Sequence, residues 1–146
     1  MKIRPMNSED RDTVLSMAEA LYGGGAVDHP IPPGNIQQSF SDAVGGSPLL
    51  RGYLLEEDGR AAGYAYVTFC YSCEAAGEVV LLEELFVKEE YRGKGLGQQF
   101  LTWLFEAFPH AVRFRLEVVR GSRAAHLYLR SGFRFISYGQ MIREAL

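Results

Sequence analysis

The sequence predicts an α/β protein in which a mixed sheet carries helices on its faces, and three observations support this fold class. The chain has 146 residues, 47% of them hydrophobic and 23% charged, which is typical of one globular domain. Segments of helical period alternate with strand-like segments in the order β-α-(α)-β-β-β-α-β-α-β. Asp58-Gly59 separates two strand-like segments, and this dipeptide is a strong signal for a two-residue hairpin. We therefore expect residues 1–146 to form a single domain.

The N-terminal part is predicted to contain a strand over 2–6 and then a helix. Asn7-Ser8-Glu9-Asp10 offers a cap and acidic residues for the first turn of this helix. Apolar residues spaced three and four apart predict its buried face: Val14, Leu15, Ala18, Leu21 and Tyr22. Gly23-Gly24-Gly25 is expected to end it. The following segment, 26–47, is predicted to be an exposed loop with one short helix around 36–44, and its His29 is a candidate for substrate contact.

The same patterns predict the remaining elements. A strand over 79–87 has apolar residues on both faces, as expected of a central strand. The other expected elements are strands over 50–57, 60–71 and 112–118, helices over 96–108 and 122–130, and one or two final strands within 133–141.

Composition excludes several classes of protein. The formal net charge of −3 argues against nucleic acid as a partner. There is no apolar segment near the ~18 residues that a membrane span needs. Met1–Met6 lack the apolar core of a signal peptide, so we expect a cytoplasmic location. Cys70 and Cys73 have no second cysteine pair to complete a zinc site, and we expect two reduced thiols and no metal.

Charge is distributed unevenly along the chain. Residues 1–110 hold 8 Lys or Arg and 16 Asp or Glu, a balance of −8, whereas residues 111–146 hold 7 Arg and 2 Glu, a balance of +5. One interpretation is scattered solvated charge. The other is a pair of oppositely charged partners, an anion on one side and a cation on the other.

The most specific motif is the glycine-rich segment 91–98, Tyr-Arg-Gly-Lys-Gly-Leu-Gly-Gln, between the central strand and the helix after it. The start of a helix exposes unpaired N–H groups, and glycines let an anion approach them. With two basic residues beside it, such a turn is suited to a pyrophosphate. The alternative is that Gly93 and Gly95 only permit a tight turn and Gly97 a close helix crossing. The spacing is neither that of a Walker loop nor that of a dinucleotide fingerprint.

Arg92-Gly93-Lys94-Gly95-Leu96-Gly97 matches the Arg-x-x-Gly-x-Gly signature of the GCN5-related N-acetyltransferase (GNAT) superfamily. A second segment, Ala124-x-x-Leu127-Tyr128-x-x-x-Gly132-Phe133, resembles that family's second motif. The predicted order of elements is also the family's order, so the resemblance covers essentially the whole chain. It implies a mostly antiparallel central sheet in which the fourth and fifth strands splay apart, with acetyl-CoA in the gap.

The resemblance also implies which residues hold acetyl-CoA. Backbone groups of Leu85, Phe86 and Val87 would pair with the pantetheine arm. N–H groups across the turn would hold the pyrophosphate, with Gln98 beside them; the turn comprises Arg92, Gly93, Lys94, Gly95, Leu96 and Gly97. Many members carry Asn seven residues before the motif tyrosine, where this chain has Gly121, and Ser122 is a candidate substitute.

Tyr128 matches the family's tyrosine near the thioester, which is often assigned as the general acid for the leaving thiolate. The alternative is a core aromatic, because Tyr128 shares a helical face with Ala124, Leu127 and Ser131.

Glu83 and Glu84 are candidates for binding or deprotonating an amine, whose pKa near ~10.4 keeps it protonated in water. Leu82-Glu83-Glu84-Leu85-Phe86-Val87 is similar to Leu-Glu-Asp-Ile-Tyr-Val in diamine and thialysine acetyltransferases of the superfamily, where the acidic pair orients or deprotonates a cationic amine. Neighbouring side chains on a strand point to opposite faces, so we expect only one of the two on the face of the acyl group. The other would be an exposed residue that pairs with an arginine.

The expected function is transfer of an acetyl group from acetyl-CoA to a primary amine of a small, cationic acceptor, by direct attack in a ternary complex. Alternative acceptors are an aminoglycoside and a protein lysine or N-terminus. The alternative from another class is a CoA-binding sensor domain without turnover. Terminal strands in this family often pair between subunits, which is compatible with a homodimer.

Overall fold

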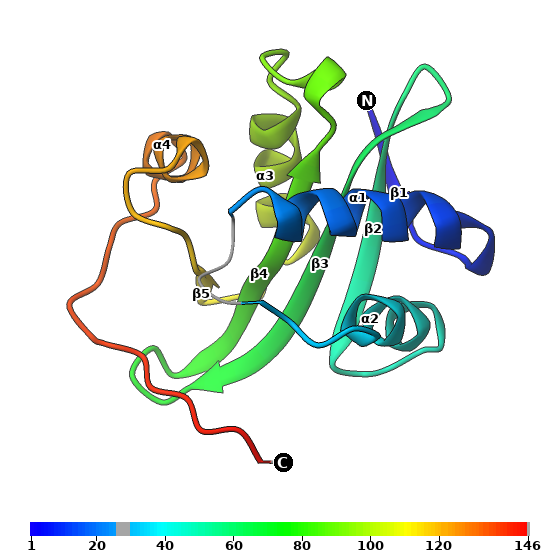
Figure 1. Ribbon diagram of the computed structural model, residues 1–146. Helices are drawn as coiled ribbons and strands as arrows, with labels where there is room; N and C mark the ends of the chain where they lie inside the picture. The colour runs from blue at the N-terminus through cyan, green and yellow to red at the C-terminus, as the bar shows by residue number, and fades with distance from the viewer. Residues whose placement is uncertain (26–29, 146) are drawn as a thin grey trace.

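A five-stranded sheet with strand order β1-β2-β3-β4-β5 forms the centre of the computed structural model (Figure 1), which describes residues 1–25 and 30–145. Neighbouring strands are antiparallel, except that β4 and β5 are parallel. The strands are β1 (Lys2–Pro5), β2 (Leu50–Glu57), β3 (Arg60–Ser72), β4 (Gly77–Val87) and β5 (Arg113–Leu116). The helices are α1 (Arg11–Gly23), α2 (Asn35–Val44), α3 (Leu96–Ala107) and α4 (Arg123–Arg130), with short 3₁₀ turns η1 (Ser8–Asp10) and η2 (Glu89–Tyr91). The predicted mixed α/β class is confirmed.

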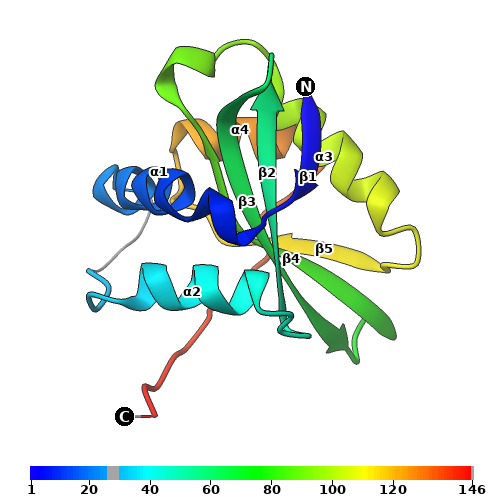
Figure 2. The ribbon, with the colours of Figure 1, turned by 90° about the vertical axis from the view of Figure 1, so that its right-hand side faces the viewer.

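Helices cover both faces of the sheet, and each face has its own hydrophobic core (Figure 2). α1 and α2 pack on one face, where the buried residues include Val14, Met17, Ala18, Phe40, Leu54, Tyr64 and Tyr66. α3 and α4 cover the other face, where the buried residues include Leu55, Ala65, Val67, Val80, Leu82, Phe100, Leu101, Leu104 and Tyr128. The apolar character of β4 on both faces, noted in the sequence, follows from this two-sided burial.

Two local sequence signals act as predicted. The Asn7 side chain accepts a hydrogen bond from the Glu9 N–H, and the Asp10 carboxylate accepts from the Asn7 N–H, so Asn7 and Asp10 cap the start of the first helical segment. At the β2–β3 hairpin, Asp58 and Gly59 both have positive φ, +51° and +75°. Positive φ at both central residues defines the turn type that matches the twist of paired strands.

The prediction of one or two C-terminal strands within 133–141 is wrong. The structure has no strand in residues 133–145, and the apolar side chains of Phe135, Ile136, Met141 and Ile142 are exposed. A strand needs a neighbouring edge to accept its hydrogen bonds. The strand at this end of the sheet, β5, is only four residues long and offers a short edge for pairing. An apolar pattern in the sequence does not show whether such an edge is available.

Arg4 ties the first strand to the start of α1. Its Nη1 and Nη2 atoms donate to the two carboxylate oxygens of Asp10 at 2.8 and 2.9 Å, and its Nε donates to Glu56 at 2.9 Å. The Asp10 residue is only 8% exposed. The hydrogen bond from Arg4 is the main cause that lowers the pKa of Asp10, and the Asn7 N–H acts in the same direction.

We expect Asp10→Asn to lower the free energy of unfolding by about 2 kcal/mol, because it removes charge-assisted hydrogen bonds and leaves Arg4 with a weaker partner. The folded pKa of Asp10 is depressed, so its contribution is present above the unfolded pKa of ~3.9 and is lost as the pH falls through the folded pKa. The gap between wild type and variant should therefore narrow in acid, as measured by urea denaturation at several pH values.

Asp12→Asn is the matched control, since Asp12 lies two residues further on, in the first turn of α1, and its side chain is 99% exposed. It should change stability by less than ~0.5 kcal/mol. A gap for Asp10→Asn that stays constant from neutral to acid pH would contradict the assignment.

Candidate active site

β4 and β5 separate halfway along β4. Their ladder pairs Val79 with Arg113 and ends where Leu82 pairs with Leu116. β5 ends there, whereas β4 continues to Val87. In the described part of the chain, the edge of β4 from Glu83 to Val87 that faces away from β3 therefore has no strand partner. The expected splay of the fourth and fifth strands is confirmed, and the predicted pantetheine contacts Leu85, Phe86 and Val87 lie on this open edge.

The glycine-rich turn joins the open end of β4 to α3. Arg92 turns back on the strand, and its Nε donates to the Val87 carbonyl at 2.8 Å. Gly93 and Gly95 have φ of +75° and +81°, which L side chains rarely adopt. Gly95 is the N-cap of α3 and supplies no side-chain cap, so the first N–H groups of α3 remain available to another acceptor. This geometry fits an anion next to the open edge.

The two basic residues of the turn lie over aromatic rings. The Arg92 guanidinium carbon lies 5.5 Å from the centre of the Phe86 ring, and the Lys94 Nζ atom lies 5.6 Å from the centre of the Tyr91 ring. Both side chains are exposed, so they add positive charge to the turn without being buried. Arg92 also holds the turn against the end of β4, a role the sequence did not predict.

Gly97 and Gln98 lie where α3 packs against α4 and the residue after it. A Cβ atom added at Gly97 would lie 2.8 Å from the Leu127 Cδ2 atom, so this glycine permits the close approach of the two helices. The Gln98 Oε1 atom accepts a hydrogen bond from the Ser131 hydroxyl at 2.8 Å. A close helix crossing was one of the reasons that the sequence offered for a glycine at position 97, and the structure contains this crossing.

Tyr128 lies on α4 and is 8% exposed. Its ring packs edge-on against Phe133, with centres 5.8 Å apart, in the core on the α3 face of the sheet. Burial raises the pKa of Tyr128 to about 12, so the phenol is neutral at physiological pH. Before α4, Gly121 has φ of +74°, and the Ser122 hydroxyl accepts from the Ala125 N–H as the helix cap.

A β-bulge at Glu83 changes the face of the sheet to which the side chains after Leu82 point. Tyr66 of β3 pairs with Glu84, but the next residue, Val67, pairs with Leu82, so Glu83 is an extra residue in β4. Leu82 packs in the core on the α3 face, whereas Glu84 contacts Tyr22 of α1 on the opposite face. Without the bulge, residues 82 and 84 would share a face.

The expectation that Glu83 and Glu84 point to opposite faces is wrong, and the bulge is the physical reason. Glu83 accepts a hydrogen bond from the Thr68 hydroxyl at 3.0 Å. Glu84 accepts from the Tyr64 hydroxyl at 2.6 Å. Because residues 64, 66 and 68 alternate along β3, they share a face, and both carboxylates reach that face. The two differ in burial instead, since Glu83 is exposed and Glu84 is not.

Three tyrosines that the sequence analysis did not assign to the site surround Glu84. The hydroxyls of Tyr22 and Tyr64 donate to the two carboxylate oxygens at 2.7 and 2.6 Å. Burial raises the pKa of Glu84, although these two hydrogen bonds act in the opposite direction. Tyr64 and Tyr66, two residues apart on a predicted strand, were the available signal of a polar aromatic face.

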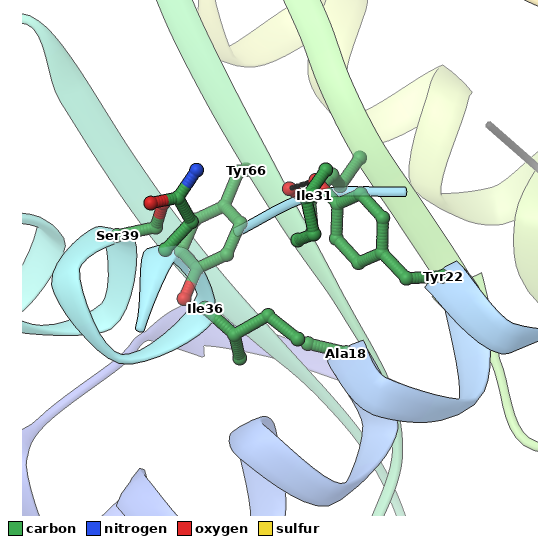
Figure 3. Close-up of a pocket in the computed structure, with 8 residues that line it drawn as sticks. Ala18, Tyr22, Ile31, Ile36, Ser39 and Tyr66 are labelled. Carbon is green, nitrogen blue, oxygen red and sulfur yellow. Dashed lines mark hydrogen bonds between the residues drawn. The ribbon is translucent and has the colours of Figure 1, made fainter. Parts of the chain in front are cut away.

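Glu84 also lines a pocket of about 140 Å³ between α1, α2 and the sheet (Figure 3). The other lining residues are Ala18, Tyr22, Ile31, Asn35, Ile36, Ser39 and Tyr66. In the close-up, the Tyr22 ring from α1 lies beside Ile31, and the Tyr66 ring from the sheet extends toward Ile36. A ligand in this pocket would meet the partly buried Glu84 carboxylate.

The remaining candidates lie outside this arrangement. Cys70 and Cys73 are exposed free cysteines. Across residues 1–25 and 30–145, no three His, Cys, Asp or Glu side chains are grouped so that they could hold a metal ion. None of the helices described is both apolar and long enough for a membrane crossing. His29 lies outside the described residues.

Comparison with known proteins identifies the family. The model of the acetyltransferase (GNAT) family matches residues 17–133, and the chain belongs to this family. No sequence among the curated proteins matches the chain.

Solved structures share the fold at low sequence identity. A possible acetyltransferase from Clostridium difficile 630 aligns with a TM-score of 0.84 and 15% identity, over 99% of this chain and 97% of that one. A transcriptional regulator from Bacillus halodurans C-125 aligns with a TM-score of 0.78 and 19% identity, over 98% and 99%. AAC(6')-Iy in complex with a bisubstrate analog, CoA-S-monomethyl-acetylneamine, aligns with a TM-score of 0.76 and 17% identity, over 99% and 98%.

We expect Glu84→Gln to change how stability depends on pH. The folded pKa of Glu84 is raised, so its contribution is fully present below the unfolded pKa of ~4.3 and is lost as the pH rises through the folded pKa. Wild type should therefore lose stability relative to Glu84→Gln as the pH rises from acid to neutral, as measured by denaturant unfolding. Glu83→Gln, at the exposed neighbour, is the matched control for the change of carboxylate to amide. A difference between wild type and Glu84→Gln that does not vary with pH would refute this assignment.

Proposed function

We propose that the protein is a cytoplasmic N-acetyltransferase that moves an acetyl group from acetyl-CoA to a primary amine of a small acceptor. The observation that carries this proposal is the bulge in β4. It places the partly buried Glu84 carboxylate in a pocket on one face, next to Leu85, Phe86 and Val87 on the open edge. An acceptor amine and an acyl donor can therefore meet on adjacent residues of one strand.

The chain's own groups fit acetyl-CoA. The unpaired edge of β4 offers backbone hydrogen bonds to the amide groups of the pantetheine arm. The uncapped start of α3, with Arg92 and Lys94 on the turn before it, suits the pyrophosphate. When bound, acetyl-CoA supplies the thioester carbonyl that the amine attacks.

Glu84 is the group we assign to the acceptor amine. An ammonium group must lose a proton before it can attack, and a buried carboxylate can both attract it and receive that proton, directly or through water. The raised pKa of Glu84 makes it a stronger base than an ordinary carboxylate. Glu83 is exposed on the same face and lies outside the lining of the pocket. The resemblance of residues 82–87 to the diamine and thialysine acetyltransferase branch supports a cationic amine in this position.

Tyr128 is the group we assign to the leaving thiolate. As a neutral phenol it can donate a proton, and a typical thiol with a pKa of ~8.5 needs little help to leave. Its place on α4, on the opposite face of the sheet from Glu84, separates the proton donor from the proton acceptor.

The experiment that tests the proposal is acetyl transfer from acetyl-CoA across a panel of amines, read by product mass. The panel contains small primary amines, diamines, lysine, aminoglycosides and peptides with a lysine or a free N-terminus. Mass detection avoids the background that the exposed Cys70 and Cys73 thiols would give with thiol reagents. Acetylation that is lost in Glu84→Gln and retained in Glu83→Gln supports the proposal. Binding of acetyl-CoA without any acetylated product would favour a sensor domain instead.

We expect Gly95→Ala to weaken acetyl-CoA binding at least about tenfold, because a Cβ atom at a positive φ distorts the start of α3. Gly59→Ala is the matched control. Gly59 has a similar φ of +75° but lies in the β2–β3 hairpin, so this variant should lose similar stability and keep its affinity. Isothermal titration calorimetry with acetyl-CoA measures both, and equal affinities would contradict the role of the turn.

We expect Tyr128→Phe to lower kcat by about ten- to a hundredfold while the Kd of acetyl-CoA stays unchanged, because the variant loses the proton donor and keeps the ring. Tyr53→Phe is the matched control, since Tyr53 is also 8% exposed and lies in the same core. Steady-state kinetics on the best amine of the panel measure the effect. Unchanged turnover in Tyr128→Phe would leave Tyr128 a core aromatic.

A further inference from the structure

The Tyr66 hydroxyl is buried and has no hydrogen-bond partner among the residues that the structure describes. Its residue is only 3% exposed. The neighbouring tyrosines do have partners, since the Tyr22 and Tyr64 hydroxyls both donate hydrogen bonds to Glu84. A buried polar group without a partner costs free energy, so such a group calls for an explanation.

Tyr66 is also one of the residues that line the Glu84 pocket. In Figure 3, the Tyr66 ring extends from the sheet between Ser39 and Tyr22, and its hydroxyl lies near Ile36. Asn35 and Ser39 of α2 add two further neutral polar side chains to the lining. The pocket therefore has a carboxylate and, apart from it, a set of neutral hydrogen-bonding groups.

The size of the pocket limits what it can enclose. Its volume is about 140 Å³. An apolar cavity of ~150 Å³ takes up benzene, a molecule of six heavy atoms. The enclosed part of the acceptor is thus roughly as large as a short aliphatic chain with one polar group.

Among the residues described, the pocket has one charged group, and this limits which ligands it can take. Glu84 is the acidic group of the described lining, which otherwise consists of neutral side chains. A second ammonium group would find no second carboxylate there, and a carboxylate would be repelled by Glu84. Burial and the nearby Glu84 raise the pKa of Tyr66, so its hydroxyl keeps its proton and can donate it to an oxygen atom.

We infer that the acceptor is a short primary amine with an uncharged oxygen function, such as a hydroxyl or amide group, and that this oxygen accepts a hydrogen bond from Tyr66. This inference rests on the proposed function, which places the amine nitrogen at Glu84. Tyr66 then selects the acceptor by the chemical group at the end of the acceptor opposite its amine.

The test uses four probes of nearly equal length that differ at one end: propanolamine, butylamine, diaminopropane and β-alanine. Their affinities for the protein without acetyl-CoA are measured by NMR titration. We expect propanolamine to bind about fivefold tighter than butylamine, which is the effect of one neutral hydrogen bond. Diaminopropane and β-alanine should both bind more weakly than propanolamine. Tighter binding of butylamine, diaminopropane or β-alanine than of propanolamine overturns the inference.

Tyr66→Phe removes only the hydroxyl, so we expect the fivefold preference for propanolamine to fall below about twofold while butylamine binding is unchanged. Tyr71→Phe, at a 68% exposed tyrosine of the same strand, is the matched control and should keep the preference. A preference that survives in Tyr66→Phe overturns the role of Tyr66. Ser39→Leu, which fills the pocket from α2, should weaken propanolamine at least about tenfold, and unchanged affinity would place the amine elsewhere.

Product mass with acetyl-CoA separates this inference from the proposed function. If amines are acetylated but Tyr66→Phe acetylates propanolamine with unaltered KM, the inference fails and the proposed function stands. If the binding preference depends on Tyr66 but neither these probes nor the amines of the panel are acetylated, the pocket is confirmed as an amino-alcohol site and the proposed activity fails.

Discussion

The bulge at Glu83 is the constraint on which the rest of the site depends. A regular strand would place residues 82 and 84 on the same face, and Glu84 would then enter the apolar core beneath α3. An unpaired carboxylate in such a core is very costly. One extra residue turns the strand so that Leu82 remains in that core and Glu84 faces α1 and α2. The same strand then continues past the end of β5 with an open edge.

The partners of Glu84 come from distant parts of the chain. Tyr22 lies at the end of α1 and Tyr64 in the middle of β3, and their hydroxyls satisfy both carboxylate oxygens. The Arg4–Asp10 pair connects the start of α1 to β1. Burial still raises the pKa of Glu84 despite these hydrogen bonds, and a raised pKa is compatible with the role of a base that we propose for it.

The two sides of the sheet have different tasks in this arrangement. α3 and α4 approach closely because Gly97 has no side chain to meet Leu127, and this brings Tyr128 into the core on their face. α1 and α2 enclose the pocket on the other face. In the proposed function, separate elements recognise the acetyl donor and the amine acceptor, and β4 contacts both.

Sequence patterns were sufficient to predict the order and approximate bounds of most elements, the Asp58-Gly59 hairpin, the glycine-rich turn and the family resemblance. These features depend on local patterns, because turn geometry, helical period and exposed N–H groups are properties of neighbouring residues. The register of β3 with β4 could not be predicted from these patterns, and neither could the bulge or the shared face of Glu83 and Glu84 that follow from it. Only the tertiary structure shows that Tyr22, Tyr64 and Tyr66 meet around Glu84, and that residues 133–145 form no strand. Strand pairing joins residues far apart in the chain, and no local pattern specifies which edge is free to accept a strand.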